Sequence, residues 1–246
     1  MFRVFYRMSD AANPMGQAPH AAKVEEIMGR VERKHCFKNF ISVFNVEDMT
    51  VFADNVTDNT IDFLTKHNVN KIVRTSLGNT KSFMLIINTA IAEYSDDDII
   101  YIAEDDYFHL PNSQQLLIEG LEVGHYATVF DHPDKYDDNA GNPFIHGGGE
   151  NTKVVATKST HWKHTNATTG TVAFKVKTIK EDYDVIARNC QDHFSYPRDF
   201  SMFQELINSK GRIVVSSLPG RSSHVGLVMS PFVDWKTIAE KYRHEN

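Results

Sequence analysis

The sequence Ile99-Ile100-Tyr101-Ile102-Ala103-Glu104-Asp105-Asp106 places three carboxylates directly after five largely apolar residues. The run shows no alternation with polar residues, which is typical of a strand covered on both faces, as in the centre of a parallel α/β sheet. In open α/β sheets, ligands bind at the carboxyl ends of the strands. The stretch therefore predicts a central strand over 99–103 and a functional site at residues 104–106.

The segments on both sides of this strand alternate between strand-like and helix-like patterns. Short β-prone runs are separated by segments in which apolar residues recur three or four apart, the spacing of an amphipathic helix. This order predicts an α/β domain with a mainly parallel central sheet flanked by helices. The expected strands are 3–6, 49–53, 71–74, 99–103, 126–130, 154–157, 171–174 and 212–216, and the expected helices are 23–44, 58–67, 80–94, 113–123, 179–188, 199–208 and 234–242.

Three further expectations concern the second half of the chain. Residues 131–150 are rich in Asp, Asn, Pro and Gly, which predicts a long irregular loop. Residues 161–164 are expected to connect two strands. The final helix, 234–242, is expected to lie on the surface.

Composition narrows the class of protein. The 246 residues carry a formal net charge of −6, which disfavours a nucleic-acid-binding surface because such surfaces are usually basic. The two cysteines are far apart and outside any Cys-x-x-Cys pattern, which favours reduced thiols over a disulfide framework or a zinc ribbon. The sequence shows neither a signal-peptide pattern nor a run of about 18 apolar residues, so we expect no transmembrane segment and a cytoplasmic protein.

The carboxylates of residues 104–106 are candidate metal ligands. Three adjacent negative charges repel one another, and a bound cation would relieve that repulsion. Oxygen ligands of this kind suit Mg²⁺ or Mn²⁺. The alternative is a solvated acidic turn, which we expect for residues 96–98, because they are equally acidic but precede the strand at the opposite edge of the sheet.

The β/α order and the sequence Ile-Tyr-Ile-Ala-Glu-Asp-Asp-Tyr at 100–107 resemble the nucleotide-binding half of GT-A glycosyltransferases, in particular family 2-like members with a Glu-Asp-Asp form of the DxD motif. The resemblance covers most of the chain in element order. It implies one GT-A-like domain over 1–246, with a nucleotide-sugar donor half at 1–110 and an acceptor half at 111–246. The implied reaction moves a sugar from a nucleotide diphosphate, most often UDP, to a glycan or other hydroxyl acceptor with inversion.

The same resemblance implies roles for the acidic residues and for two residues late in the chain. Asp106 would ligate the metal, Asp105 would contact the ribose or support the ligand, and Glu104 would have a supporting role. GT-A enzymes frequently supply a second metal ligand from a C-terminal histidine. His224 stands at the matching place, with a surface histidine as the alternative. Arg221 would pair with phosphate or remain a solvated loop charge.

An inverting transferase needs a general base that takes the proton of the acceptor hydroxyl. Asp199 resembles the base of the family in its position. An aspartate at the start of a helix is equally well explained as an N-cap. Asp192 and Glu205 are the alternative bases.

By the same resemblance, the nucleotide contacts polar residues at strand ends and at the start of the helix before the acidic residues. Gly78 allows close approach of the backbone at a helix N-terminus, which favours anions, and Arg7 would neutralise phosphate. Neither a Rossmann nor a P-loop glycine pattern occurs in the sequence. The candidate nucleotide-sugar-binding residues are Tyr6, Arg7, Asp10, Asp54, Asn55, Gly78, Asn79 and Ser82, together with Glu104, Asp105 and Arg221.

Acceptor contacts are expected after the donor half, where Trp162 and His164 combine an aromatic face with a hydrogen-bonding group. The alternative for Trp162 is a core residue. Two other classes of protein share the strand-end carboxylates. One is a metal-dependent nucleotidyltransferase or phosphohydrolase, for which further acidic ligands or a phosphate-gripping loop are not evident. The other is a non-catalytic nucleotide-sugar-binding module.

Overall fold

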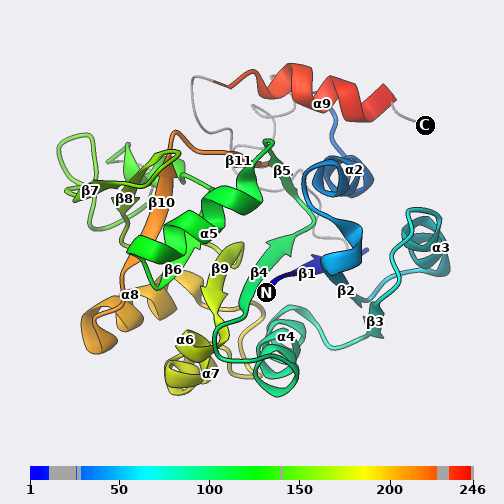
Figure 1. Cartoon of the computed structure of the whole chain (residues 1–246), viewed down its shortest axis with the longest axis horizontal. Helices are drawn as coiled ribbons and strands as arrows, with labels where there is room; N and C mark the ends of the chain where they lie inside the picture. Colours follow the sequence, from blue (N-terminus) through cyan, green and yellow to red (C-terminus); the bar gives the residue numbers. More distant parts are fainter. Residues whose placement is uncertain (11–25, 27–28, 139–140, 226–232, 245–246) are drawn as a thin grey trace.

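The apolar run 99–103 forms strand β4 (Ile99–Glu104), which lies inside a nine-stranded sheet of order β3-β2-β1-β4-β9-β6-β10-β8-β7. The structure is a computed structural model and describes residues 1–10, 26, 29–138, 141–225 and 233–244. Within these residues, β9 and β8 run antiparallel to both of their neighbours, and the other seven of the nine strands share one direction. The fold class is confirmed: a single mixed α/β domain has a mainly parallel sheet with helices on both sides (Figure 1).

Four parallel strands form the first part of the sheet. The strands β1 (Phe2–Met8), β2 (Met49–Asp54) and β3 (Ile72–Thr75) lie beside β4. Their register pairs Arg7 with Glu104 and Asp54 with Thr75. The carboxyl ends of these strands therefore meet at one edge of the sheet, where polar side chains replace the buried apolar ones.

Helices bury both faces of the sheet because their apolar sides pack on alternate strand residues. One apolar core joins Val4 and Tyr6 of β1 to α2 (Arg33–Val43), α3 (Asp58–Lys66) and α5 (Ser113–Val123). The other joins Phe5 of β1 to α4 (Asn79–Glu93), α6 (Val176–Glu181), α7 (Tyr183–Asn189) and α8 (Asp199–Lys210). Two short 3₁₀ helices are η1 (Val46–Asp48) and η2 (Pro133–Lys135).

The second part of the sheet is mixed. Its strands are β9 (Val172–Lys175), β6 (Tyr126–Thr128), β10 (Val214–Leu218), β8 (His161–His164) and β7 (Val154–Ala156). A separate two-stranded sheet pairs β5 (Tyr107–His109) with β11 (Ser222–His224). This small sheet brings the segment after β10 back to the residues that follow the acidic triplet.

The C-terminal helix α9 (Trp235–His244) packs against α2 (Figure 1). Trp235, Ala239 and Tyr242 are buried in an apolar cluster with Phe108 and Cys36. The helix expected over 234–242 is present, and it lies at the surface with Lys236, Thr237 and Lys241 exposed, while its other side closes a small core of its own. Within the described residues, no helix has both the length and the apolar character needed to cross a membrane.

Several sequence-based boundaries also need correction. The helix expected at 23–44 is not continuous: Glu26 is helical, but α2 begins only at Arg33, after Gly29, whose φ of +69° is incompatible with a continuous α-helix. Residues 23–25 and 27–28 of that prediction lie outside the described residues. The helix expected at 179–188 is divided at Asp182, which is buried and bonds to Arg212 and the Tyr126 hydroxyl.

The sequence periodicity also failed to predict three strands, β5, β8 and β11. Residues 161–164 are not a connector but the strand β8, which pairs antiparallel with β10 and β7. The strands β5 and β11 were not predicted, since each has only three residues and their pairing joins distant parts of the chain. The strand expected at 126–130 ends at Thr128.

Candidate functional site

Arg7, at the end of β1, links the acidic triplet to the start of α4. Its Nη1 donates to Glu104 Oε1 at 2.8 Å, and its Nη2 donates to the carbonyl and the Oδ1 of Asn79 at 3.1 and 2.6 Å. Ser82 Oγ lies 3.4 Å from the same Nη2. The structure thus brings four of the predicted nucleotide-binding residues into one cluster at the carboxyl edge.

Glu104 is held from a second side by Thr171, which lies just before β9. Thr171 Oγ1 donates to Glu104 Oε2 at 3.2 Å, and a Cβ at Gly170 would stand only 3.3 Å from Glu104 Oε1. Burial raises the pKa of Glu104, although Arg7 opposes the shift. Sequence reasoning missed Thr171, because nothing in a single sequence indicates that residue 171 reaches the end of β4.

Asp105 lies under the end of β1. Its Oδ2 accepts a hydrogen bond from the backbone N–H of Ser9 at 2.8 Å and is 3.5 Å from Arg33 Nη1. Burial raises the pKa of Asp105 to about 7, although Arg33 opposes the shift. The Tyr6 ring is fully buried against Phe37 and Phe40, and its hydroxyl has no hydrogen-bond partner. Tyr6 therefore offers a buried hydroxyl near the acidic residues, not an open ring face.

Asp106 and His224 face one another across the small sheet. The β5–β11 register pairs His224 with Tyr107, which sets His224 Nε2 3.2 Å from Asp106 Oδ2. The Tyr107 ring supports the imidazole edge-on, with centroids 4.9 Å apart. Asp106 Oδ1 is buried and has no hydrogen-bond partner among the residues that the structure describes. An orphaned carboxylate oxygen beside an imidazole is an arrangement that a cation would complete.

The electrostatics of this pair follow from mutual attraction. Burial would raise the pKa of Asp106, but the His224 charge and hydrogen bond bring it below its ordinary value. Burial would lower the pKa of His224, but Asp106 brings it above its ordinary value. Among the described residues, no group of three or more His, Cys, Asp or Glu side chains is arranged to hold a metal ion.

The residues at the end of β2 satisfy one another. Asp54 accepts hydrogen bonds from the backbone N–H groups of Leu77 and Gly78 at 2.6 and 2.9 Å and from Thr75 Oγ1 at 2.8 Å. Asn55 donates to the same carboxylate at 2.8 Å. Gly78 adopts a φ of +84°, which permits the turn into α4. This carboxylate therefore shapes the loop before α4.

Asp10 lies at the N-terminus of α3. Its carboxylate accepts hydrogen bonds from the Thr57 backbone N–H at 2.7 Å and from the hydroxyls of Thr57 and Thr60. These bonds satisfy donors that the first turn of a helix leaves open. They account for Asp10 without a ligand.

Asp199 is the first residue of α8, and its Oδ1 accepts a hydrogen bond from the Phe200 backbone N–H at 2.7 Å. The N-cap position itself belongs to Arg198, so the N-cap interpretation of Asp199 is wrong. Burial raises the pKa of Asp199 from 3.8 to about 6, and the nearby Glu104 carboxylate adds to the shift. Asp199 therefore lies within electrostatic range of the acidic triplet.

The alternative bases are engaged elsewhere. Glu205 accepts hydrogen bonds from Arg188 and Asn189, and Asp192 is exposed and paired with Lys81. Of the candidate bases, only Asp199 combines burial with proximity to Glu104.

Neither predicted acceptor residue faces solvent at the carboxyl edge, and Trp162 is the core residue that was its alternative interpretation. Trp162 is 0% exposed in the core, with its indole N–H bonded to Thr157 Oγ1 at 3.0 Å, so it has no surface to offer an acceptor. His164 pairs with Val215 near the amino end of β10, away from the carboxyl edge. Arg221, which was predicted to bind the nucleotide-sugar, donates to the carbonyl of Pro111 at 3.0 Å.

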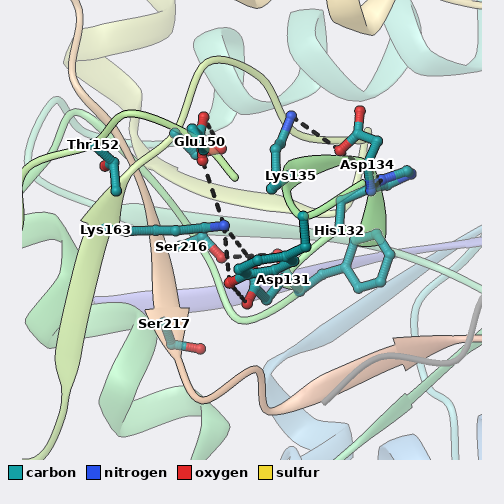
Figure 2. A network of polar contacts seen from close by, with 12 residues as sticks. Asp131, His132, Asp134, Lys135, Glu150, Thr152, Lys163, Ser216 and Ser217 are labelled. Carbon is teal, nitrogen blue, oxygen red and sulfur yellow. Dashed lines mark hydrogen bonds and ion pairs between the residues drawn. The ribbon is translucent and has the colours of Figure 1, made fainter. Parts of the chain in front are cut away.

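A network of buried charges lies beside the site and was not predicted (Figure 2). Lys163 of β8 is 2.8 Å from Asp131 Oδ1 and 3.4 Å from Glu150 Oε2. Asp131 begins the loop 131–150 and Glu150 ends it, so one lysine closes both ends of this loop. Inside the loop, Lys135 pairs with Asp134 at 3.2 Å.

No protein-family model matches this sequence, and neither does any curated protein. Among solved structures, the chain is similar to GalNAc-T7 with UDP, GalNAc and Mn²⁺, with a TM-score of 0.54, 10% identity and coverage of 99% of this chain and 49% of that one. It is also similar to a putative glucose-1-phosphate thymidylyltransferase from Bacillus anthracis in complex with a sucrose, with a TM-score of 0.52, 11% identity and coverage of 100% and 97%. This chain thus spans about half of GalNAc-T7. At these identities the likeness establishes a GT-A-like fold and nothing finer.

Proposed function

We propose that this protein is a metal-dependent glycosyltransferase that moves a sugar from a nucleotide diphosphate donor, with UDP as the expected nucleotide, to a hydroxyl acceptor with inversion. The observation that carries the proposal is the Asp106–His224 pair, in which Asp106 Oδ1 is buried and has no hydrogen-bond partner within the described part of the chain. The pair lies at the carboxyl edge of a GT-A-like sheet, where ligands of open α/β sheets bind. Residues 1–110 would form the donor half and 111–246 the acceptor half.

Asp106 and His224 would hold Mn²⁺ or Mg²⁺. Such ions at nucleotide sites are usually bound by one or two protein groups, with phosphate oxygens and water as the remaining ligands. A two-residue site therefore suits a metal that arrives with a diphosphate, and the imidazole favours Mn²⁺ over Mg²⁺. When bound, the cation would stabilise the negative charge that develops on the leaving diphosphate.

The other residues of the edge would position the reactants. Arg7 fixes Glu104 against the start of α4, which keeps the donor side of the site rigid. Asp199 Oδ1 is occupied by the Phe200 N–H, so Oδ2 is the atom that would take the proton of the acceptor hydroxyl. A raised pKa makes this carboxylate a better proton acceptor than an ordinary aspartate near neutral pH.

The direct test combines binding with turnover. A panel of UDP-, GDP- and dTDP-sugars is added with Mn²⁺ or with excess chelator, while the melting temperature and the release of nucleoside diphosphate are measured. We expect one donor to stabilise the fold only with metal, and to release nucleoside diphosphate. Equal stabilisation in chelator would contradict the metal site, and stabilisation without turnover on any acceptor would indicate a binding module.

A nucleotidyltransferase is the second candidate. The observation in its favour is that the match to the thymidylyltransferase spans 97% of that chain, against 49% for GalNAc-T7. The two candidates differ in products. A nucleotidyltransferase would release pyrophosphate from a nucleoside triphosphate and a sugar phosphate, whereas a glycosyltransferase would release a nucleoside diphosphate from a nucleotide-sugar.

A further inference from the structure

Phe144 presents an aromatic ring to solvent beside the candidate base. Its side chain is 57% exposed, which is unusual for phenylalanine. One face stacks on the Phe200 ring, with centroids 6.1 Å apart and planes 19° apart. Phe200 follows Asp199 directly and donates its backbone N–H to that carboxylate. The exposed ring of Phe144 therefore packs on the residue that follows and hydrogen-bonds to the candidate base.

The position of Phe144 is held by the polar network of its loop. The Phe144 N–H donates to Asn142 Oδ1 at 3.2 Å, and the amide groups of Asn142 and Asn166 bond to each other at 3.2 and 3.3 Å. Lys135 Nζ donates to Asn166 Oδ1 at 2.6 Å. Gln204 of α8 donates to the Asn166 carbonyl at 2.6 Å. The loop that carries Phe144 is thus tied to the helix that begins with Asp199.

The two ends of this loop are fixed as well. Asp131 and Glu150 both approach Lys163 (Figure 2). Glu150 Oε1 also accepts a hydrogen bond from the Asn166 N–H at 2.7 Å. Because the described residues on both sides of Phe144 make these contacts, little conformational entropy is lost there when a ligand binds. The exposed ring is therefore a preorganised surface.

We propose that the acceptor is a saccharide whose pyranose ring stacks on the open face of Phe144 while one of its hydroxyls reaches Asp199. This inference rests on the proposed transfer reaction and names the class of its acceptor. A sugar ring combines a face of C–H groups with an edge of hydroxyls, and the site combines an aromatic face with a carboxylate. Burying the exposed ring removes apolar area from water, which supplies the driving force for docking.

The test uses the full chain labelled with ¹³C-phenylalanine in the presence of UDP and Mn²⁺. Methyl glycosides of glucose, galactose and mannose are titrated while the ring resonances are recorded, and Phe144→Leu identifies the signal of Phe144. We expect at least one methyl hexoside to shift this signal saturably. Phe144→Ala should weaken its binding roughly tenfold or more, and Phe144→Trp should retain it.

The matched control is Tyr183→Ala, which removes another partly exposed aromatic ring. Tyr183 begins α7 next to Asp182, which bonds to Tyr126 at the amino end of β6, so it lies at the opposite edge of the sheet. This variant should bind the hexoside like the unaltered protein. Unchanged binding in Phe144→Ala, or no shift of the Phe144 signal by any hexoside, overturns the saccharide site.

The result is separable from the proposed transfer reaction. Stabilisation by a nucleotide-sugar with Mn²⁺ reports on Asp106 and His224, and Phe144→Ala should leave it unchanged. Hexoside binding at Phe144 without any metal-dependent donor binding would support the saccharide site and contradict the transferase. Metal-dependent donor turnover without hexoside binding at Phe144 would support the transferase and contradict the saccharide site.

Discussion

His224 Nε2 lies 3.2 Å from Asp106 Oδ2, and the other oxygen of that carboxylate is buried with no hydrogen-bond partner in the described ranges of the chain. The two residues are far apart in the chain and meet because β11 pairs with β5. The contact connects the end of β4, in the first part of the sheet, to the segment that follows β10. It therefore makes the candidate site depend on the whole domain.

Asp106→Ala or His224→Ala should each remove stabilisation by a nucleotide-sugar with Mn²⁺ and lower transfer on the order of a thousandfold, because several kcal/mol of charge stabilisation are lost. Asp97→Ala is the control, since Asp97 is exposed before β4 at the opposite edge. It should retain both properties. Melting temperature and initial rate are measured on all three variants. Equal losses in the control would mean that the site is misplaced.

Asp199→Asn should lower transfer by roughly two to four orders of magnitude while donor binding survives, because asparagine cannot take a proton. With the pKa of Asp199 near 6, the wild-type rate should rise with pH through about 6 as the carboxylate ionises. Glu205→Gln is the control, since Glu205 pairs with Arg188 away from the triplet. A full rate in Asp199→Asn would eliminate the base assignment.

Asp199→Asn should lower the transfer rate but raise the stability of the fold near neutral pH. Because the folded-state pKa of Asp199 is raised from 3.8 to about 6, the folded state holds the proton more tightly than the unfolded chain. Stability therefore falls between these two values as pH rises, and above about 6 the ionised group destabilises the fold in full. Asp199→Asn should raise the melting temperature at pH 7 and change it little at pH 4. Thermal unfolding at both pH values measures this, and a lower melting temperature at pH 7 would contradict the electrostatic account.

Asp54→Ala should cost about 2–4 kcal/mol in the free energy of unfolding, because two backbone N–H groups of the loop before α4 lose a charged acceptor. The control is Asp58→Ala, which removes an exposed ion pair with Arg74 and should cost about 0–1 kcal/mol. Urea unfolding compares the two variants. If they cost the same, the Asp54 carboxylate does not shape this loop.

Lys163→Met should cost about 3–5 kcal/mol, because it leaves Asp131 and Glu150 buried without their cation. Hydrogen exchange over 131–150 should rise with it, since both ends of the loop are released. Lys153→Met is the matched control, because Lys153 is exposed just before β7 and surface changes usually lie within about 0.5 kcal/mol. Unchanged exchange in Lys163→Met would show that the loop is held by other contacts.

Several single elements of the fold could be predicted closely from the sequence. Helix 113–123 was predicted at its observed bounds, and β2 and β4 each extend one residue beyond their predicted ends. These elements have strong local patterns. The short strands β5 and β11 have none, because three residues are too few to show a period and their partners are distant.

The sequence by itself determined the alternation of strands and helices, the buried character of β4, and the position of Glu104, Asp105 and Asp106 at its end, because periodicity and adjacency are local properties. Only the tertiary structure decided which distant groups meet there. Thr171 reaches Glu104 and Arg33 reaches Asp105 through contacts that no local pattern encodes. The burial of Trp162 was also decided by the tertiary structure, because burial depends on the packing of the whole sheet and not on the neighbours of a residue in the chain.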